Sequence, residues 1–141
     1  MRVLIDLNVL LDVAQVRQPH FADSARVLSA VVRKEFEAWI AAHCLTTLHY
    51  LIEKHNGLAA ADAAVDWHLK HFRVPALSEA VLNRARLIGM SDFEDAVVAA
   101  SAEEASCGWI VTRNVSDFAL GPVKAITPHD FLGLMKSARS P

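Results

Sequence analysis

Cysteine is scarce in this chain, and the features expected of secreted or membrane proteins are missing. The 141 residues include two cysteines, Cys44 and Cys107, which stand in no CxxC or Cys/His pattern. We interpret both as buried free thiols in a reducing compartment. No run of about twenty apolar residues is present that would cross a membrane. Asp6 and Asp12 interrupt the apolar N-terminal run, which is not typical of a secretory signal. We therefore expect a soluble, cytoplasmic protein with no membrane partner.

An excess of basic residues is missing too. Fourteen Lys and Arg residues stand against sixteen Asp and Glu residues, and the formal net charge at pH 7 is −2. Because strong non-specific nucleic-acid binders are usually basic, contact with RNA would have to come from a local patch or through a bound metal. Repeats, low-complexity stretches and linkers are also absent, and apolar residues make up 53% of the chain. This length and composition predict a single domain over residues 1–141.

Short apolar runs alternate with helix-like segments along the chain. The apolar runs predict strands at residues 3–5, 36–42, 72–74, 109–112 and 123–126. Helices are predicted at residues 8–15, 22–34, 46–55, 58–71, 78–88, 92–106 and from Pro128 onward. This alternation predicts an α/β fold, a three-layer α/β/α sandwich around a central parallel sheet of four to five strands. In such folds ligands bind beyond the carboxyl ends of the strands.

Two acidic segments follow predicted secondary-structure boundaries. Asp6 ends the first strand, with Asn8 two residues later, and its carboxylate can either bind a hard cation or cap the helix that follows. Ser91 and Glu94 fit a capping box at the start of another helix. Asp92 and Asp95 share one face of that helix. Two carboxylates on a mostly buried helix repel each other unless solvent or a cation compensates, and a divalent metal provides that compensation.

A third polar segment, Thr112 to Phe118, follows the strand at residues 109–112. Its Asn and Asp side chains are typical of an ordinary loop. In the functional interpretation, Asn114 and Asp117 reach the same cleft as the acids above, while Thr112 and Arg113 lie near a phosphate. For Arg113 the alternative is a solvated surface arginine.

The segments LIDLNVLLD, SDFEDAVVAASA and IVTRNVSDF occur in this order, and together they resemble the PIN-domain family, in particular its VapC-type toxins. The resemblance covers essentially the whole chain. It implies a PIN-like parallel-sheet sandwich with an acidic pocket that binds Mg²⁺ or Mn²⁺ and hydrolyses RNA. It also implies a cognate antitoxin that wraps the toxin and fills the pocket, and a homodimer.

The family's site residues can be carried over where the motifs match. Asp6, Asp95 and Asp117 correspond to metal-binding acids, and Asp92 to an extra acid found in part of the family. The resemblance assigns supporting positions to Asn8, Thr47, Thr112, Arg113 and Asn114. Thr47 is a departure, since it aligns with a position where the family has Glu or Asp. The loss of one charge should weaken metal binding, although Asp92 or His49 can offset it.

Three classes of function therefore remain. The first is a metal-dependent endoribonuclease, the toxin component of a type II toxin–antitoxin pair. The second is a catalytically weakened PIN-fold module that binds RNA or a partner. The third is a phosphotransferase of the dehalogenase or receiver type, which fits less well because Asn8 stands where a second Asp is needed and no lysine follows a later strand in a motif.

Overall fold

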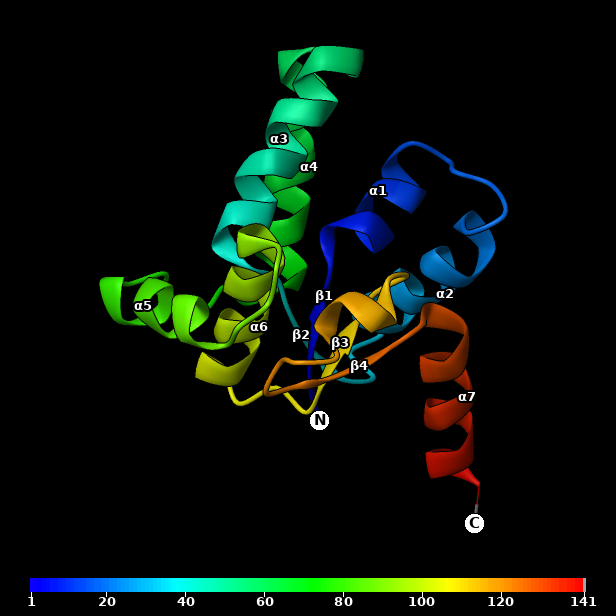
Figure 1. The fold of residues 1–141 in the computed structure, drawn as a ribbon. Coiled ribbons are helices and arrows are strands. Elements are labelled where there is room, and N and C mark those ends of the chain that lie inside the picture. The colour runs from blue at the N-terminus through cyan, green and yellow to red at the C-terminus, as the bar shows by residue number, and fades with distance from the viewer. Residues whose placement is uncertain (141) are drawn as a thin grey trace.

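A fully parallel sheet lies at the centre of the molecule, as the computed structural model of residues 1–140 shows (Figure 1). Its four strands are β1 (Arg2–Ile5), β2 (Glu37–Trp39), β3 (Trp109–Val111) and β4 (Lys124–Ile126). They are arranged in the order β2-β1-β3-β4, and every adjacent pair is parallel. The predicted parallel sheet is therefore confirmed.

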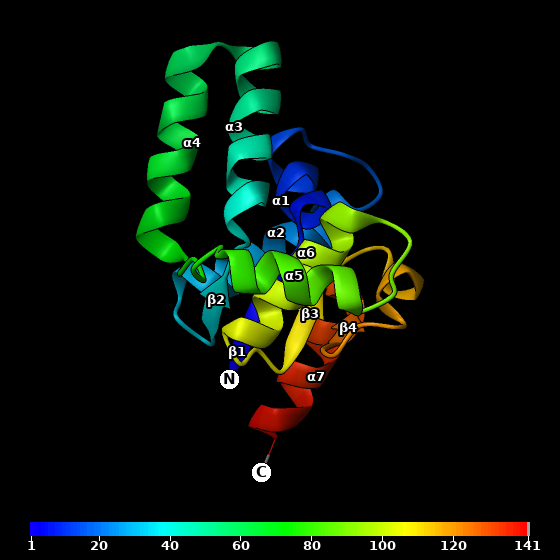
Figure 2. The same ribbon diagram turned by 60° about the vertical axis from the view of Figure 1, so that its left-hand side comes forward.

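Helices cover both faces of this sheet. One group comprises α1 (Leu7–Ala14), α2 (Phe21–Val32) and α7 (Pro128–Arg139). The other comprises α3 (Ala42–Asn56), α4 (Leu58–His71), α5 (Glu79–Leu87) and α6 (Phe93–Glu104). Figures 1 and 2 show the first group on one side of the sheet and the second on the other, with the α3–α4 hairpin projecting beyond the sheet. The predicted α/β/α layers are confirmed.

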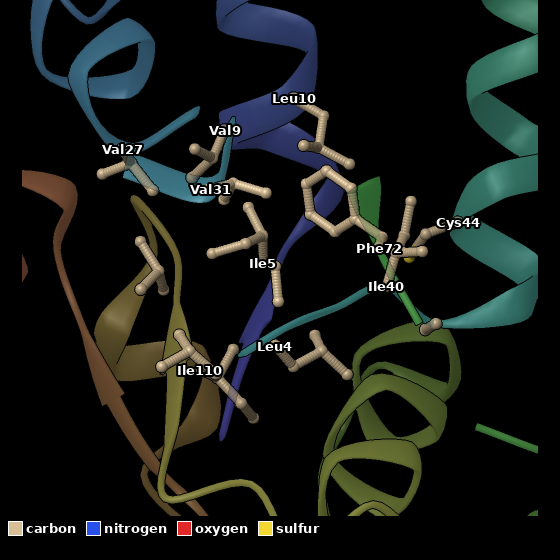
Figure 3. Close-up of a cluster of buried hydrophobic side chains, with 14 of the residues drawn as sticks. Leu4, Ile5, Val9, Leu10, Val27, Val31, Ile40, Cys44, Phe72 and Ile110 are labelled. Carbon is tan, nitrogen blue, oxygen red and sulfur yellow. The ribbon is translucent and has the colours of Figure 1, made fainter. Parts of the chain in front are cut away.

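The interior is built around β1, which has a neighbouring strand on each side. Val3, Leu4 and Ile5 have no exposed surface, so this strand is apolar on both faces, as expected for a central parallel strand. Figure 3 shows its side chains meeting those of the neighbouring layers, among them Val9, Leu10, Val27, Val31, Ile40, Cys44, Phe72 and Ile110. Both cysteines are free and buried, which confirms their predicted state.

Most helix boundaries follow from local signals in the sequence. Gly57 has φ +90°, a conformation that favours glycine, and it separates α3 from α4. Ser78 accepts a hydrogen bond from Val81 N–H and begins α5. Thr127 caps α7, whose first residue is Pro128. None of the helices within residues 1–140 combines the length and apolar character needed to cross a bilayer.

Three local predictions are corrected by the structure. The capping box is wrong, because Asp92 rather than Ser91 is the N-cap of α6. The strand predicted at 36–42 is shorter and covers residues 37–39. The segment predicted at 72–74 contributes only one bridge, Trp39 with Arg73. Pro75 follows and has no N–H to extend the pairing.

Candidate active site

Asp6 lies where β1 passes into α1, at the carboxyl edge of the sheet. Its backbone N–H donates to Val111 O of the neighbouring strand β3 over 2.9 Å. One carboxylate oxygen, Oδ1, accepts from Leu7 N–H at 2.8 Å and so caps α1. The capping role considered from the sequence is therefore confirmed, but it occupies only one of the two oxygens.

The second oxygen of Asp6 is held by Thr112. Thr112 Oγ1 donates to Asp6 Oδ2 at 2.9 Å and accepts from Asn8 Nδ2 at 3.2 Å and from Asn114 N–H at 3.1 Å. Because a hydroxyl oxygen has two lone pairs, these two donors fix its single hydrogen on Asp6. Four of the residues singled out from the sequence thus form one hydrogen-bonded group.

The ionised form of the Asp6 carboxyl remains unfavourable despite these hydrogen bonds. Its side chain is only 7% exposed. Burial raises the pKa of its carboxyl, and the charge of Asp117 raises it further, while the hydrogen bond from Thr112 is the strongest opposing effect. The charge of His43 also lowers this pKa, by more than the charge of Asp117 raises it. Among residues 1–140, however, no basic side chain forms an ion pair or a hydrogen bond with the Asp6 carboxylate, whose contacts are Leu7 N–H and the Thr112 hydroxyl.

Asp95 lies in the first turn of α6 and experiences the same repulsion. Partial burial raises its pKa to about 6, and the carboxylates of Asp92, Asp6 and Asp117 also contribute. Asp92 Oδ1 accepts from the backbone N–H of Asp95 at 3.0 Å, which places both acids in the same turn. The predicted proximity of Asp92 and Asp95 is therefore seen, with Asp92 as the cap.

Asp117 is an exposed residue of the short 3₁₀ helix η1 (Val115–Phe118). Its charge acts on the pKa values of both Asp6 and Asp95, so the three acids are near enough to interact electrostatically at this edge of the sheet. Within residues 1–140, however, no three His, Cys, Asp or Glu side chains stand close enough to hold a metal ion. The metal-ligand set remains a prediction.

Thr47, which aligns with the second acid of the PIN-like motif, lies one helical turn after His43. Thr47 Oγ1 donates to the His43 carbonyl oxygen at 3.0 Å, so its side chain is turned back onto α3. His43 Nε2 lies 3.1 Å from Glu94 O of α6, and a carbonyl only accepts, so this nitrogen carries the hydrogen. His43 was missed in the sequence because no known spacing marks it.

His49 does not replace the missing acid. Its Nε2 lies 2.9 Å from Asp62 Oδ1 of α4, and its Nδ1 lies 3.7 Å from Glu53. These contacts belong to the α3–α4 hairpin. The suggestion that His49 completes the acidic site is therefore not supported.

Arg113 is directed inward, toward α1. Its Nε lies 2.9 Å from Asp12 Oδ2, and its side chain is 25% exposed whereas that of Asp12 is fully buried. Arg113 Nε has no hydrogen-bond partner among the residues that the structure describes, so this contact is an ion pair only. Arg113 is thus not the freely solvated arginine considered from the sequence. The role of Asp12 was missed, although its place in an apolar run is unusual.

The parallel sheet and the acids at its carboxyl edge define a class of α/β proteins with an acidic site. A comparison with protein families matches residues 2–116 to the PIN domain. The chain therefore belongs to the PIN-domain family. No curated protein sequence matches it.

Solved structures with this fold include several toxin–antitoxin proteins. VapBC-1 from nontypeable Haemophilus influenzae is 11% identical, with a TM-score of 0.70 over 92% of this chain and 99% of that chain. VapC20 from Mycobacterium tuberculosis, described as a sarcin–ricin loop cleaving toxin, is 17% identical, with a TM-score of 0.68 over 84% and 95% of the two chains. VapBC2 from Rickettsia felis, bound to a promoter DNA fragment, is 14% identical, with a TM-score of 0.67 over 90% and 98%. At these identities the likeness shows the fold, which is that of VapC toxins.

Proposed function

We propose that this protein is a metal-dependent endoribonuclease and the toxin component of a type II toxin–antitoxin pair. The observation that carries the proposal is that burial and the charges of Asp92, Asp6 and Asp117 together raise the pKa of Asp95 to about 6. Asp6 and Asp92 stabilise their helices as N-caps, but the negative charge gathered around Asp95 favours a cationic ligand.

The donor groups at this edge fit a hard divalent cation in their chemistry. Asp6, Asp95 and Asp117 offer carboxylate oxygens, which are the ligands that Mg²⁺ and Mn²⁺ prefer, and we propose that they hold the ion. When bound, such an ion lowers the pKa of a water molecule and neutralises charge on the phosphodiester.

The remaining residues of the site have supporting roles. Thr112 orients Asp6 through its hydroxyl, and Asn8 keeps Thr112 in place. Asn114 N–H donates to the same hydroxyl, which holds the start of the loop that leads to Asp117. Asp92 fixes the backbone of Asp95, and its negative charge adds to the attraction for a cation.

An apolar groove supports the proposed antitoxin partner. It lies between α1, α2, α3 and α4 and encloses about 620 Å³. Its lining is mainly apolar and includes Leu10, Val13, Leu28, Val32, Ile52 and Trp67. A hollow of this kind accepts the apolar face of a helix.

A substitution at the rim of this groove tests the antitoxin partner. Because the Val32 side chain is 46% exposed, Val32→Glu should not unfold the toxin. It should abolish co-purification of the protein encoded next to this one. Homodimerisation stays a prediction.

Cleavage of a single-stranded RNA in Mn²⁺ tests the enzyme assignment. We expect Asp95→Asn to reduce the cleavage rate at least about 100-fold, because a carboxylate ligand becomes a neutral amide. Glu94→Gln, an exposed neighbour in the same turn, is the matched control and should retain most activity. Equal cleavage by the wild type and Asp95→Asn would refute the assignment.

The second candidate function is a PIN module that binds RNA or a partner without cutting it. It is favoured by Thr47, whose hydroxyl is committed to the His43 carbonyl and supplies no charge. Calorimetry with Mn²⁺ separates the two candidates, since a pure binding module takes up no metal. If Thr47→Glu raises both Mn²⁺ affinity and cleavage, the site is a weakened nuclease.

A further inference from the structure

Asp12 is a fully buried carboxylate that the proposed chemistry does not use. It lies in the second turn of α1 and has no exposed surface. Its Oδ2 lies 2.9 Å from Arg113 Nε and accepts from Ser24 Oγ at 3.0 Å. Its Oδ1 has no hydrogen-bond partner among the residues that the structure describes. A well-packed apolar pair often replaces a buried ion pair at no cost in stability, so stability alone does not account for Asp12 and Arg113.

The contact with Asp12 is one of four that hold the loop after β3 against α1 and its N-cap, the Asn8–Thr112 hydrogen bond among them. Thr112 Oγ1 donates to Asp6, and the backbone N–H of Arg113 donates to Asn8 Oδ1 at 3.3 Å. The Arg113 side chain then reaches Asp12. The four contacts involve the N-cap of α1, its second residue and its sixth, so they run along the helix. Arg113 lies at the centre of the anchored segment.

This anchored segment leads directly into η1, which carries Asp117. We propose that Asp12 and Arg113 are positioning residues, whose ion pair sets where residues 113–118 lie relative to Asp6 and Asp95. In this role Arg113 holds the loop and does not bind phosphate. The inference deepens the proposed nuclease function, and it names two residues that act through Asp117 rather than on the substrate.

Amide hydrogen exchange of the full-length protein tests the proposal without depending on RNA cleavage. Asp12→Asn keeps the size of the side chain and removes the charge that attracts Arg113. We expect the amides of residues 113–118 to exchange at least about tenfold faster, with the α3–α4 hairpin unchanged. Arg33→Gln, which breaks an exposed pair with Glu35, is the matched control and should change neither segment. A uniform rise across the chain, or no change in residues 113–118, would overturn the proposal.

A double variant separates positioning from stability and remains informative if Asp12→Asn fails to fold. Asp12→Leu combined with Arg113→Met replaces the buried charges by apolar side chains of similar volume. We expect a melting temperature at or above that of the wild type, together with fast exchange in residues 113–118 and weaker Mn²⁺ binding by calorimetry. If the double variant instead restores full protection of this loop and wild-type Mn²⁺ binding, the pair only fills the interior. If Mn²⁺ binds neither the wild type nor the variant but the exchange result holds, the nuclease assignment fails and the positioning role stands.

Discussion

The two buried aspartates associated with α1 are stabilised in different ways. Asp12 is fully buried beside the guanidinium of Arg113, so its charge is matched within the protein. Asp6 is 7% exposed, and its oxygens accept only from a backbone N–H and a hydroxyl. The charge of His43 lowers its pKa and the charge of Asp117 raises it, but no basic side chain of residues 1–140 contacts the carboxylate as Arg113 contacts Asp12. Burial alone therefore does not distinguish the two residues.

The difference between them is whether a basic side chain contacts the carboxylate, as Arg113 contacts Asp12. A buried acid with a basic partner has its charge neutralised within the protein, and its role is structural or positional. A buried acid among other acids is incomplete, and it indicates a cation or a proton from outside the protein. This contrast makes different predictions for variants at the two ends of α1.

The largest expected effect is on the matched pair. Arg113→Met leaves the Asp12 carboxylate buried without a cation, which should cost about 3–5 kcal/mol of the free energy of unfolding. Urea denaturation measures this loss. Arg84→Met, which breaks the exposed pair with Glu103, is the control and should cost about 0–1 kcal/mol. Similar losses for the two variants would remove the contrast between matched and exposed pairs.

The next effect concerns the hydroxyl that supports Asp6. Thr112→Val removes one donor from Asp6 and leaves the donors of Asn8 and Asn114 without their acceptor, which should cost about 2 kcal/mol. It should also raise the pKa of Asp6 still further, because the Thr112 bond is the main influence that lowers it. Thr112→Ser keeps the hydroxyl and should stay close to the wild type in both unfolding and cleavage. A Thr112→Val protein as stable as Thr112→Ser would contradict the geometry.

A smaller effect of opposite sign is expected at Asp95. Its pKa is raised from 3.8 to about 6, so between these values the folded protein binds more protons than the unfolded chain. Stability therefore falls as the pH rises through this window. Asp95→Asn should stabilise the metal-free protein by about 1 kcal/mol at pH 7.5, allowing for partial exposure, and by much less at pH 4. Melting temperatures at both pH values check this. Asp92→Asn keeps the N-cap and removes one of the charges that raise the pKa of Asp95, so it should give a smaller gain in the same direction. A loss of stability at pH 7.5 would mean that burial and the neighbouring acids do not disfavour the ionised form of Asp95.

The smallest effect belongs to His68, a buried titratable group on α4. Burial lowers its pKa below the ordinary value of 6.5, and its Nδ1 lies 2.6 Å from Ala64 O. Below pH 6.5 the unfolded chain binds a proton that the folded protein does not, so stability falls as the pH decreases. His68→Leu should reduce this dependence by roughly 0.5 kcal/mol per pH unit between pH 6.5 and 5.5. An unchanged slope would show that folding does not change the proton affinity of His68.

The parallel sheet and most helices could be predicted from the sequence because their signals are local. Val3 to Ile5 form a continuous apolar run, Gly57 ends a helix, and Pro128 begins one. The prediction of a capping box was wrong because two adjacent residues, Ser91 and Asp92, are both good N-caps. The choice between them depends on how α6 packs. The strand prediction at residues 72–74 was wrong because the pairing of this segment ends after one residue, which no local pattern reveals.

The candidate site was predictable in its residue types but not in its contacts. The order of the motifs identified Asp6, Asp95 and Asp117. It did not show that Arg113 lies against Asp12, since that contact joins residues about 100 positions apart. Nor did it show that the Thr47 hydroxyl is used within its own helix. Contacts of this kind depend on side-chain directions, which one sequence does not contain.

The pairing of β1 with β3 also has a consequence for how the protein is made. Thr112 Oγ1 reaches Asp6 across 106 positions of the chain, and Asp117 lies later still. A growing polypeptide on the ribosome therefore contains Asp6 long before the loop with Thr112 and Asp117 has been translated. Nascent chains shorter than about 112 residues lack Thr112, so Asp6 has no hydrogen bond from this hydroxyl until that length is passed.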